Sequence, residues 1–276
     1  AHEPVRRYIN TLVGGAAGRW PLDWFQEAFS GLRFARALSV GCGTGALERD
    51  LLQRGLCDAI DAFDGSIGSL AAARSLEPRV RYYASDFNRP ALPRNHYDAV
   101  FCHQSLHHVA KLEKLFRAIL LALKPEGYLY IDEYVGPSRS EWTPRLIAAA
   151  DEVYRTVVPP EARNEHLAAP IVPEDPSEAV RSSEIVAQLG RGFDVVAMRP
   201  YGGDLLAIVC PQIDWTQAQP DLIDALIARE RDAFPKSHHA IIVARPKKGT
   251  RARVASARYF FEPKVKRVLR ALTSAP

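Results

Sequence analysis

A glycine turn between a predicted strand and a predicted helix is the feature that most constrains this fold. The apolar run 35–40 predicts a strand, and the apolar spacing of 47–52 predicts a helix. Between them stands GCGTG at residues 41–45. Glycine lets the backbone turn tightly and approach a ligand closely, and the following helix offers unpaired N–H groups at its N-terminus. The segment therefore predicts a site for a nucleotide-type cofactor.

The glycine turn opens a regular alternation of strands and helices. Strands are predicted at 59–63, 80–84, 97–102, 128–134, 193–198 and 239–244, and helices at 67–74, 111–123 and 177–189. Such an alternation builds a mostly parallel sheet that is covered by helices on both faces.

The flanking segments have a different character. Residues 1–34 predict a helical cover, and residues 35–245 form the α/β domain. Within that domain the polar, proline-rich stretch 136–176 is expected to be a helical lid that contacts substrate. Residues 246–276 predict a basic tail with a short amphipathic helix.

Composition excludes several classes of protein. Of 276 residues, 47% are hydrophobic and 25% are charged, which is an ordinary globular composition. No stretch approaches the roughly 18 uninterrupted apolar residues of a membrane span, and the first ten residues lack the apolar region of a signal peptide. The four cysteines stand far apart, and no metal-ligand set is predicted. A cytoplasmic protein with reduced thiols is expected.

The net charge of +4 hides an asymmetry between the body and the tail. Residues 245–276 hold ten basic residues and one acid, so the remainder holds 26 basic and 31 acidic residues. The tail could meet a nucleic acid or an anionic membrane, or it could be a solvated segment that docks on the body.

The glycine turn alone leaves the cofactor open. The spacing Gly41-x-Gly43-x-x-Ala46 also fits the dinucleotide fingerprint, which would make the protein a nicotinamide-dependent oxidoreductase. Asp64 ends the second predicted strand, where a carboxylate can accept both ribose hydroxyls of an adenosine cofactor. Asp61 is the rival position for this role.

Further motifs decide between these cofactors. SDFN follows the third strand at 85–88, YDAVF forms the fourth at 97–101, SLHHV follows it at 105–109, and LKPEG precedes the fifth at 123–127. In this order the segments resemble the successive motifs of class I S-adenosylmethionine-dependent methyltransferases, over residues 36–134. The resemblance implies a Rossmann-like fold with a seven-stranded, mostly parallel sheet whose last strand runs antiparallel.

The resemblance also implies a set of cofactor-binding residues. The glycine turn would lie against the methionyl part of S-adenosylmethionine, and S-adenosylhomocysteine would be the product. Asp64 would hold the ribose, Asp86 would accept a hydrogen bond from the adenine amino group beside Phe87, and His103 would line the methionine end. The full predicted set is Gly41, Cys42, Gly43, Gly45, Asp64, Gly65, Ser66, Asp86, Phe87 and His103. One departure is Ser39, where the family usually has an acid.

The same resemblance favours O-methylation of a small-molecule or glycan hydroxyl. A hydroxyl acceptor must lose its proton, so His107 or His108 is the candidate base, and the pair is predicted to open the helix after the fourth strand. Glu133, at the end of the fifth strand, could orient an imidazole or receive the proton itself. The predicted substrate contacts are Arg139, Trp142 and Tyr201. A catalytically silent cofactor-binding partner subunit is the alternative.

Overall fold

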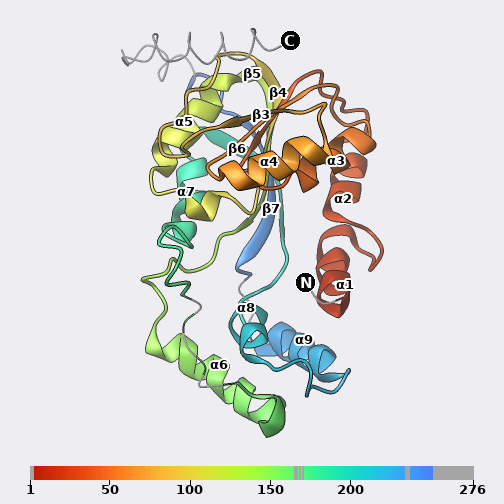
Figure 1. Ribbon diagram of the computed structural model, residues 1–276, viewed down its shortest axis with the longest axis vertical. Helices are drawn as coiled ribbons and strands as arrows, with labels where there is room; N and C mark the ends of the chain where they lie inside the picture. Colours follow the sequence, from red (N-terminus) through yellow and green to blue (C-terminus); the bar gives the residue numbers. More distant parts are fainter. Residues whose placement is uncertain (1–2, 165–166, 168, 170, 234–236, 251–276) are drawn as a thin grey trace.

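A seven-stranded sheet forms the centre of the computed structural model, which describes residues 3–164, 167, 169, 171–233 and 237–250 (Figure 1). The strand order is β3-β2-β1-β4-β5-β7-β6. Strands β1 to β5 pair in parallel, and β7 pairs antiparallel with β5 and β6. The predicted seven-stranded, Rossmann-like sheet and its antiparallel last strand are therefore confirmed. The strands are β1 (Ala37–Val40), β2 (Ile60–Asp64), β3 (Arg81–Ala84), β4 (Tyr97–His103), β5 (Leu123–Tyr134), β6 (Phe193–Pro200) and β7 (His239–Pro246).

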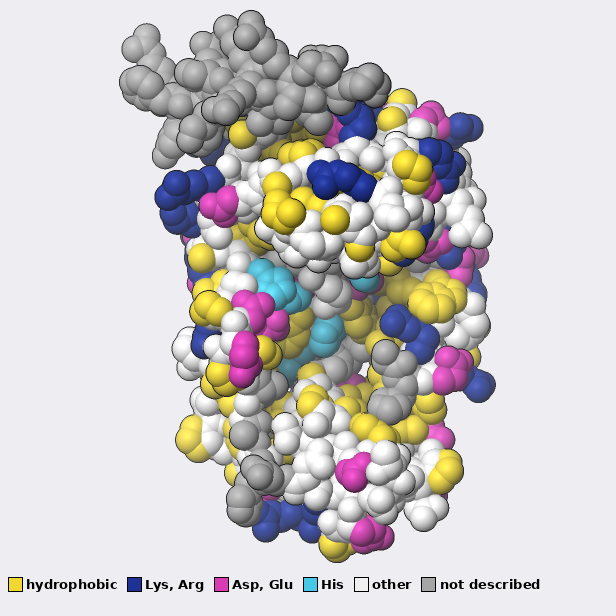
Figure 2. All heavy atoms as spheres, in the orientation of Figure 1, with side chains coloured by type: hydrophobic (Ala, Val, Ile, Leu, Met, Phe, Trp, Pro, Cys, Tyr) yellow, Lys and Arg dark blue, Asp and Glu magenta, His cyan; other side chains and the backbone are white. Residues whose placement is uncertain are grey.

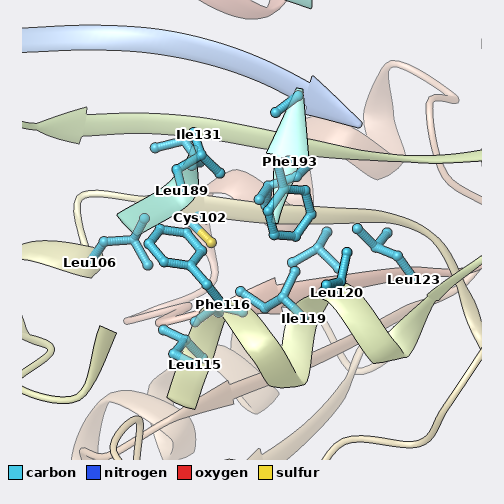
Figure 3. Close-up of a cluster of buried hydrophobic side chains, with 14 of the residues drawn as sticks. Cys102, Leu106, Leu115, Phe116, Ile119, Leu120, Leu123, Ile131, Leu189 and Phe193 are labelled. Atoms are coloured by element: carbon cyan, nitrogen blue, oxygen red, sulfur yellow. The ribbon is translucent and has the colours of Figure 1, made fainter. Parts of the chain in front are cut away.

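Helices cover both faces of the sheet because side chains alternate along each strand. Val100 and Cys102 of β4 pack in a cluster with α5 and α7, whereas Ala99 and Phe101 pack with α2, α3 and α4 on the other face. Figure 3 shows the first cluster, in which Phe116 lies beside Cys102. The helices are α2 (Pro21–Ala28), α3 (Ala46–Gln53), α4 (Ile67–Leu76), α5 (Leu112–Ala122) and α7 (Ile185–Leu189).

A third apolar cluster lies away from the sheet. It joins α6 (Pro144–Val157), α8 (Leu206–Val209) and α9 (Leu222–Ala233), and α1 (Glu3–Gly14) packs against it. Helices α6, α8 and α9 lie beyond the end of the sheet in Figure 1. Figure 2 shows a hollow between the sheet-bearing part and these helices, with histidine side chains along it.

Local structure differs from the sequence prediction in three places. The predicted helix 177–189 is wrong over its first part, where turns precede the 3₁₀ helix η3 (Ser182–Glu184) and α7. The backbone there is held by other hydrogen bonds, because Ser177 donates its N–H to Asp175 and Val180 donates its N–H to the carbonyl of His107. The 3₁₀ helix η1 (Leu106–His108) follows β4, so the histidine pair does not open α5. Strand β5 begins at Leu123 instead of residue 128.

The ends of the chain add two facts. The predicted amphipathic helix of the basic tail lies outside the described residues, which end at Thr250. Within the described residues, every helix is too short or too polar to cross a bilayer.

Candidate active site

The glycine turn joins β1 to α3 with a backbone conformation that leaves no room for a side chain at two of its glycines. The φ angles of Gly41, Gly43 and Gly45 are 74°, 51° and 80°. A Cβ on Gly41 would stand 2.3 Å from the Cβ of Ser105, and one on Gly45 would stand 2.5 Å from the hydroxyl of Tyr82. At Gly43 a Cβ would meet nothing within 4 Å. The turn is therefore packed on two sides and open at its middle glycine.

Asp64 holds this turn from the end of β2. Its Oδ2 accepts the N–H of Gly43 at 2.9 Å, and its Oδ1 accepts the N–H of Ser66 at 2.8 Å. Ser66 in turn caps α4 by accepting the N–H of Ser69. The rival Asp61 is 2% exposed and accepts a hydrogen bond from Tyr97, so it belongs to the core.

Asp86 and Phe87 follow β3 at the same edge of the sheet. Asp86 is exposed, and its Oδ1 accepts the N–H of Asn88. Phe87 packs on Phe63 with ring centroids 5.6 Å apart, and its Cε1 lies 3.3 Å from the position of a Cβ on Gly41. The aromatic ring thus stands beside the glycine turn.

These residues fit an adenosine-type cofactor. The open side of Gly43 gives room for close approach, and one carboxylate, Asp64, ends β2 while another, Asp86, follows β3. Cys42 is buried, and burial raises the pKa of its thiol well above the usual range. It is therefore a packing residue of the turn instead of a nucleophile.

Glu133 organises the backbone after β4. This carboxylate is fully buried. Its Oε2 accepts the N–H groups of Ser105 and Leu106 at 2.7 and 2.6 Å. Its Oε1 accepts the N–H of Tyr134 at 2.7 Å and lies 2.5 Å from Nδ1 of His107. With four donors around it, Glu133 is suited to orient His107.

The histidine pair lies on η1. His107 is 7% exposed; its burial lowers the pKa of the imidazole, but the hydrogen bond and charge of Glu133 outweigh this effect and raise the pKa above its ordinary value. His108 is half-buried, its ring centroid 4.2 Å from that of His107, and its Nδ1 lies 3.1 Å from Oγ of Ser177. Glu178, from the turn before η3, faces both rings. Sequence reasoning missed Glu178, since only the tertiary fold brings it here.

His103 and Asp132 form a second polar pair at the ends of β4 and β5. Nε2 of the exposed His103 lies 3.7 Å from Oδ2 of Asp132. Tyr201 donates to Oδ1 of Asp132 at 2.6 Å, and burial raises the pKa of this carboxyl group. Tyr201 is itself 7% exposed, so the structure uses this predicted substrate residue to hold Asp132.

The predicted substrate residues of the insert have defined partners. Arg139 donates from its backbone to the carbonyl of Ala179 and from its guanidinium to that of Pro176. It therefore ties the start of the insert to the turn that carries Glu178. Trp142 is half-buried, and its ring lies 6.0 Å from that of His238.

Glu48 of α3 is a buried acid near Ser39 and His103 that the sequence did not reveal. It is fully buried, and neither carboxylate oxygen has a hydrogen-bond partner in the described part of the chain. Burial raises the pKa of Glu48, and the nearby Ser39 hydroxyl offsets this only in part. A glutamate in an amphipathic helix normally faces water, so only its place three residues before the buried Leu51 hinted at burial.

The central part of the chain is similar to known proteins. Residues 38–131 match the family model described as a methyltransferase domain. A ubiquinone biosynthesis O-methyltransferase of Bordetella avium is 33% identical over 113 residues, which are 40% of this chain and 46% of that protein. A demethylmenaquinone methyltransferase of Renibacterium salmoninarum is 30% identical over 144 residues, 51% of this chain and 60% of that protein. The chain thus spans about half the length of these curated relatives.

Solved structures show the same fold. The [4+2]-cyclase SpnF aligns with a TM-score of 0.52 and 19% identity over 88% of this chain and 93% of that one. Phosphoethanolamine N-methyltransferase 2 of Haemonchus contortus, solved with S-adenosyl-L-methionine, aligns with a TM-score of 0.51 and 19% identity over 83% of this chain and 53% of that one. At these identities the likeness describes the fold alone.

Proposed function

We propose that this chain, which carries a class I S-adenosylmethionine-dependent methyltransferase domain, methylates a hydroxyl group of a small molecule. The observation that carries the proposal is the shared edge of the sheet: the glycine turn held by Asp64 and the Glu133–His107 pair both stand at the carboxyl ends of the strands. Ligands of open α/β sheets bind at this edge. A cofactor cradle and a group that can accept a proton therefore lie at the same end of the sheet.

The chain's own residues divide the binding of the cofactor. S-adenosylmethionine supplies a methyl group that is activated on a sulfonium. Asp64 is proposed to bind the ribose hydroxyls, and Asp86 and Phe87 to bind the adenine. Gly43, whose added Cβ would meet nothing within 4 Å, is proposed to lie against the methionyl part, with His103 near its end.

The histidine pair is proposed to activate the acceptor hydroxyl. Glu133 holds Nδ1 of His107, so Nε2 of that ring is free to interact with a proton or another electrophile. His108 lies on the same turn and is more exposed. Glu133 is a positioning residue here, because its oxygens already accept hydrogen bonds from the backbone after β4.

The surroundings of the site favour a planar acceptor. The partly buried Tyr134 lies 6.5 Å from His107 and 5.2 Å from His239 between ring centroids. Such a series of rings suits an aromatic hydroxyl such as a phenol or a hydroquinone. The similarity to ubiquinone O-methyltransferases supports the same class. A sugar hydroxyl is the alternative acceptor, and the insert with Arg139 and Trp142 is proposed to select between them.

Two measurements test this function. Calorimetric titration should show micromolar binding of S-adenosylhomocysteine and no binding of NADH; the reverse result would make the glycine turn a dinucleotide site. Transfer of labelled methyl groups is then compared between hydroquinone and sugar acceptors. Turnover of the hydroquinones alone supports the proposal. Cofactor binding without transfer to any hydroxyl would instead favour a silent partner subunit.

A further inference from the structure

Three lone-pair atoms converge beside η1. Nε2 of His107 lies 3.7 Å from Oε2 of Glu178, and Nε2 of His108 lies 3.8 Å from the same oxygen. All three groups offer ligand atoms within 4.8 Å of one another. Figure 2 shows histidine side chains next to acidic ones at the edge of the hollow.

The hydrogen bonds around the two rings place their protons on the far side. Nδ1 of His107 faces the Glu133 carboxylate at 2.5 Å, so that nitrogen carries a proton, and in the neutral ring Nε2 then carries the lone pair. Ser177 donates its hydroxyl proton to Asp175 at 2.6 Å, so its oxygen is an acceptor for Nδ1–H of His108 at 3.1 Å. With both rings neutral, neither Nε2 nor the Glu178 carboxylate has a proton to share. The three groups repel one another unless a proton or a cation lies between them.

We propose that Nε2 of His107, Nε2 of His108 and a carboxylate oxygen of Glu178 form a binding site for a divalent metal ion of the zinc type. Ligand atoms about 2.0–2.1 Å from a tetrahedral zinc ion stand about 3.4 Å apart, so the contacts to Glu178 need to close by only a few tenths of an ångström. Two imidazoles and one carboxylate leave a fourth position open, as in catalytic zinc sites.

The surroundings of the site match those of bound metal ions. A metal-ligating histidine commonly donates its other ring N–H to a carboxylate or a similar acceptor, as both rings do here. The turn that carries Glu178 is fastened on both sides, because Val180 donates to the carbonyl of His107 and Arg139 donates to that of Ala179. Among the described residues, the only ion-pairing groups of Glu178 are the two imidazoles.

The site itself does not depend on the proposed methyl transfer, whereas its catalytic use does. With a metal ion on both Nε2 atoms, the rings cannot accept the acceptor's proton. The ion would instead polarise the acceptor hydroxyl at its open position, and the proton would pass to solvent. This assigns the histidine pair a specific way of activating the acceptor.

Metal titration of the full-length, tag-free protein tests the site. After treatment with chelator, zinc chloride is titrated in competition with a chromophoric chelator, and cobalt chloride is added separately to record the visible absorption of tetrahedral cobalt. One zinc ion per chain should bind. H108A and E178Q should each weaken zinc binding at least 100-fold and abolish the cobalt bands, and E174Q, which removes an exposed acid four residues before Glu178, should stay within twofold.

The outcomes separate the metal site from the proposed function. Circular dichroism and calorimetry with S-adenosylhomocysteine on the same samples show whether each variant is folded and binds cofactor. The metal site is refuted if folded wild-type protein binds no stoichiometric zinc, or if E178Q and E174Q bind it equally well. Zinc binding without cofactor binding would uphold the site and refute the proposed function. Loss of methyl transfer on chelation, restored by zinc, would support the catalytic use of the ion.

Discussion

Replacing Glu133 by glutamine should strongly destabilise the protein. The buried carboxylate accepts hydrogen bonds from three backbone N–H groups and faces Nδ1 of His107. Each oxygen of this carboxylate faces two N–H donors. A glutamine of the same shape keeps one of these oxygens and replaces the other by an NH₂ group, which cannot accept the two hydrogen bonds that the lost oxygen accepted. Each orphaned buried donor costs about 1–3 kcal/mol, so E133Q should lower the free energy of unfolding by about 2–6 kcal/mol.

Urea unfolding at constant pH measures this loss. The matched control is E152Q, which makes the same chemical change at an exposed position of α6 and should stay within about 0.5 kcal/mol of wild type. Native-state hydrogen exchange adds a local readout, because the amides of Ser105 and Leu106 should exchange faster in E133Q. If the two variants unfold at the same urea concentration, Glu133 does not carry these hydrogen bonds and cannot be what orients His107.

Three further substitutions test the site. G41A should lower the free energy of unfolding by at least about 1–3 kcal/mol and weaken the binding of S-adenosylhomocysteine, because residue 41 has a positive φ and the new Cβ would clash with Ser105. Thermal unfolding and calorimetry measure the two effects. If neither changes, the close approach of Gly41 to Ser105 is refuted. E48Q should be more stable than wild type at pH 8. Because burial raises the pKa of Glu48, wild type should gain stability as the pH falls from 8 toward 5, and E48Q should gain less. Urea unfolding midpoints of both proteins at pH 8 and pH 5 measure this difference. D64A should weaken the binding of S-adenosylhomocysteine at least tenfold, whereas the control D58A, at the surface, should weaken it less than twofold. If calorimetry finds equal affinities for the two variants, another residue binds the ribose.

The sequence predicts the sheet well because its signals are local. The strands from β1 to β4 are short segments rich in apolar and aromatic residues and bounded by turn residues. The GCGTG segment needs positive φ angles that glycine adopts without strain. Asp64 could be found for the same reason, since it ends a strand and precedes a capping serine.

The residues that the sequence misses depend on contacts between distant segments. The predicted helix at 177–181 gives way to turns because the His107 carbonyl, about seventy residues earlier, takes up the N–H of Val180. The same contact presents Glu178 to the imidazoles. Tyr201 looks like a substrate residue after a strand, yet the fold turns it inward to Asp132. Propensity cannot foresee either event, because tertiary hydrogen bonds override it.

The reaction must be argued from these chain-specific residues and not from the fold. A protein described as a [4+2]-cyclase shares this architecture at a TM-score of 0.52, so a Rossmann-like sheet with a glycine turn does not by itself determine the chemistry. In this chain the proposed cofactor cradle lies at the ends of β1, β2 and β3, whereas the imidazoles lie on η1 and Glu178 faces them from a separate turn. The proposal therefore assigns cofactor binding and acceptor activation to different segments. Substitutions at Glu178 should lower turnover and leave cofactor affinity unchanged. Substitutions at Asp64 should weaken cofactor affinity and leave turnover at saturating cofactor unchanged.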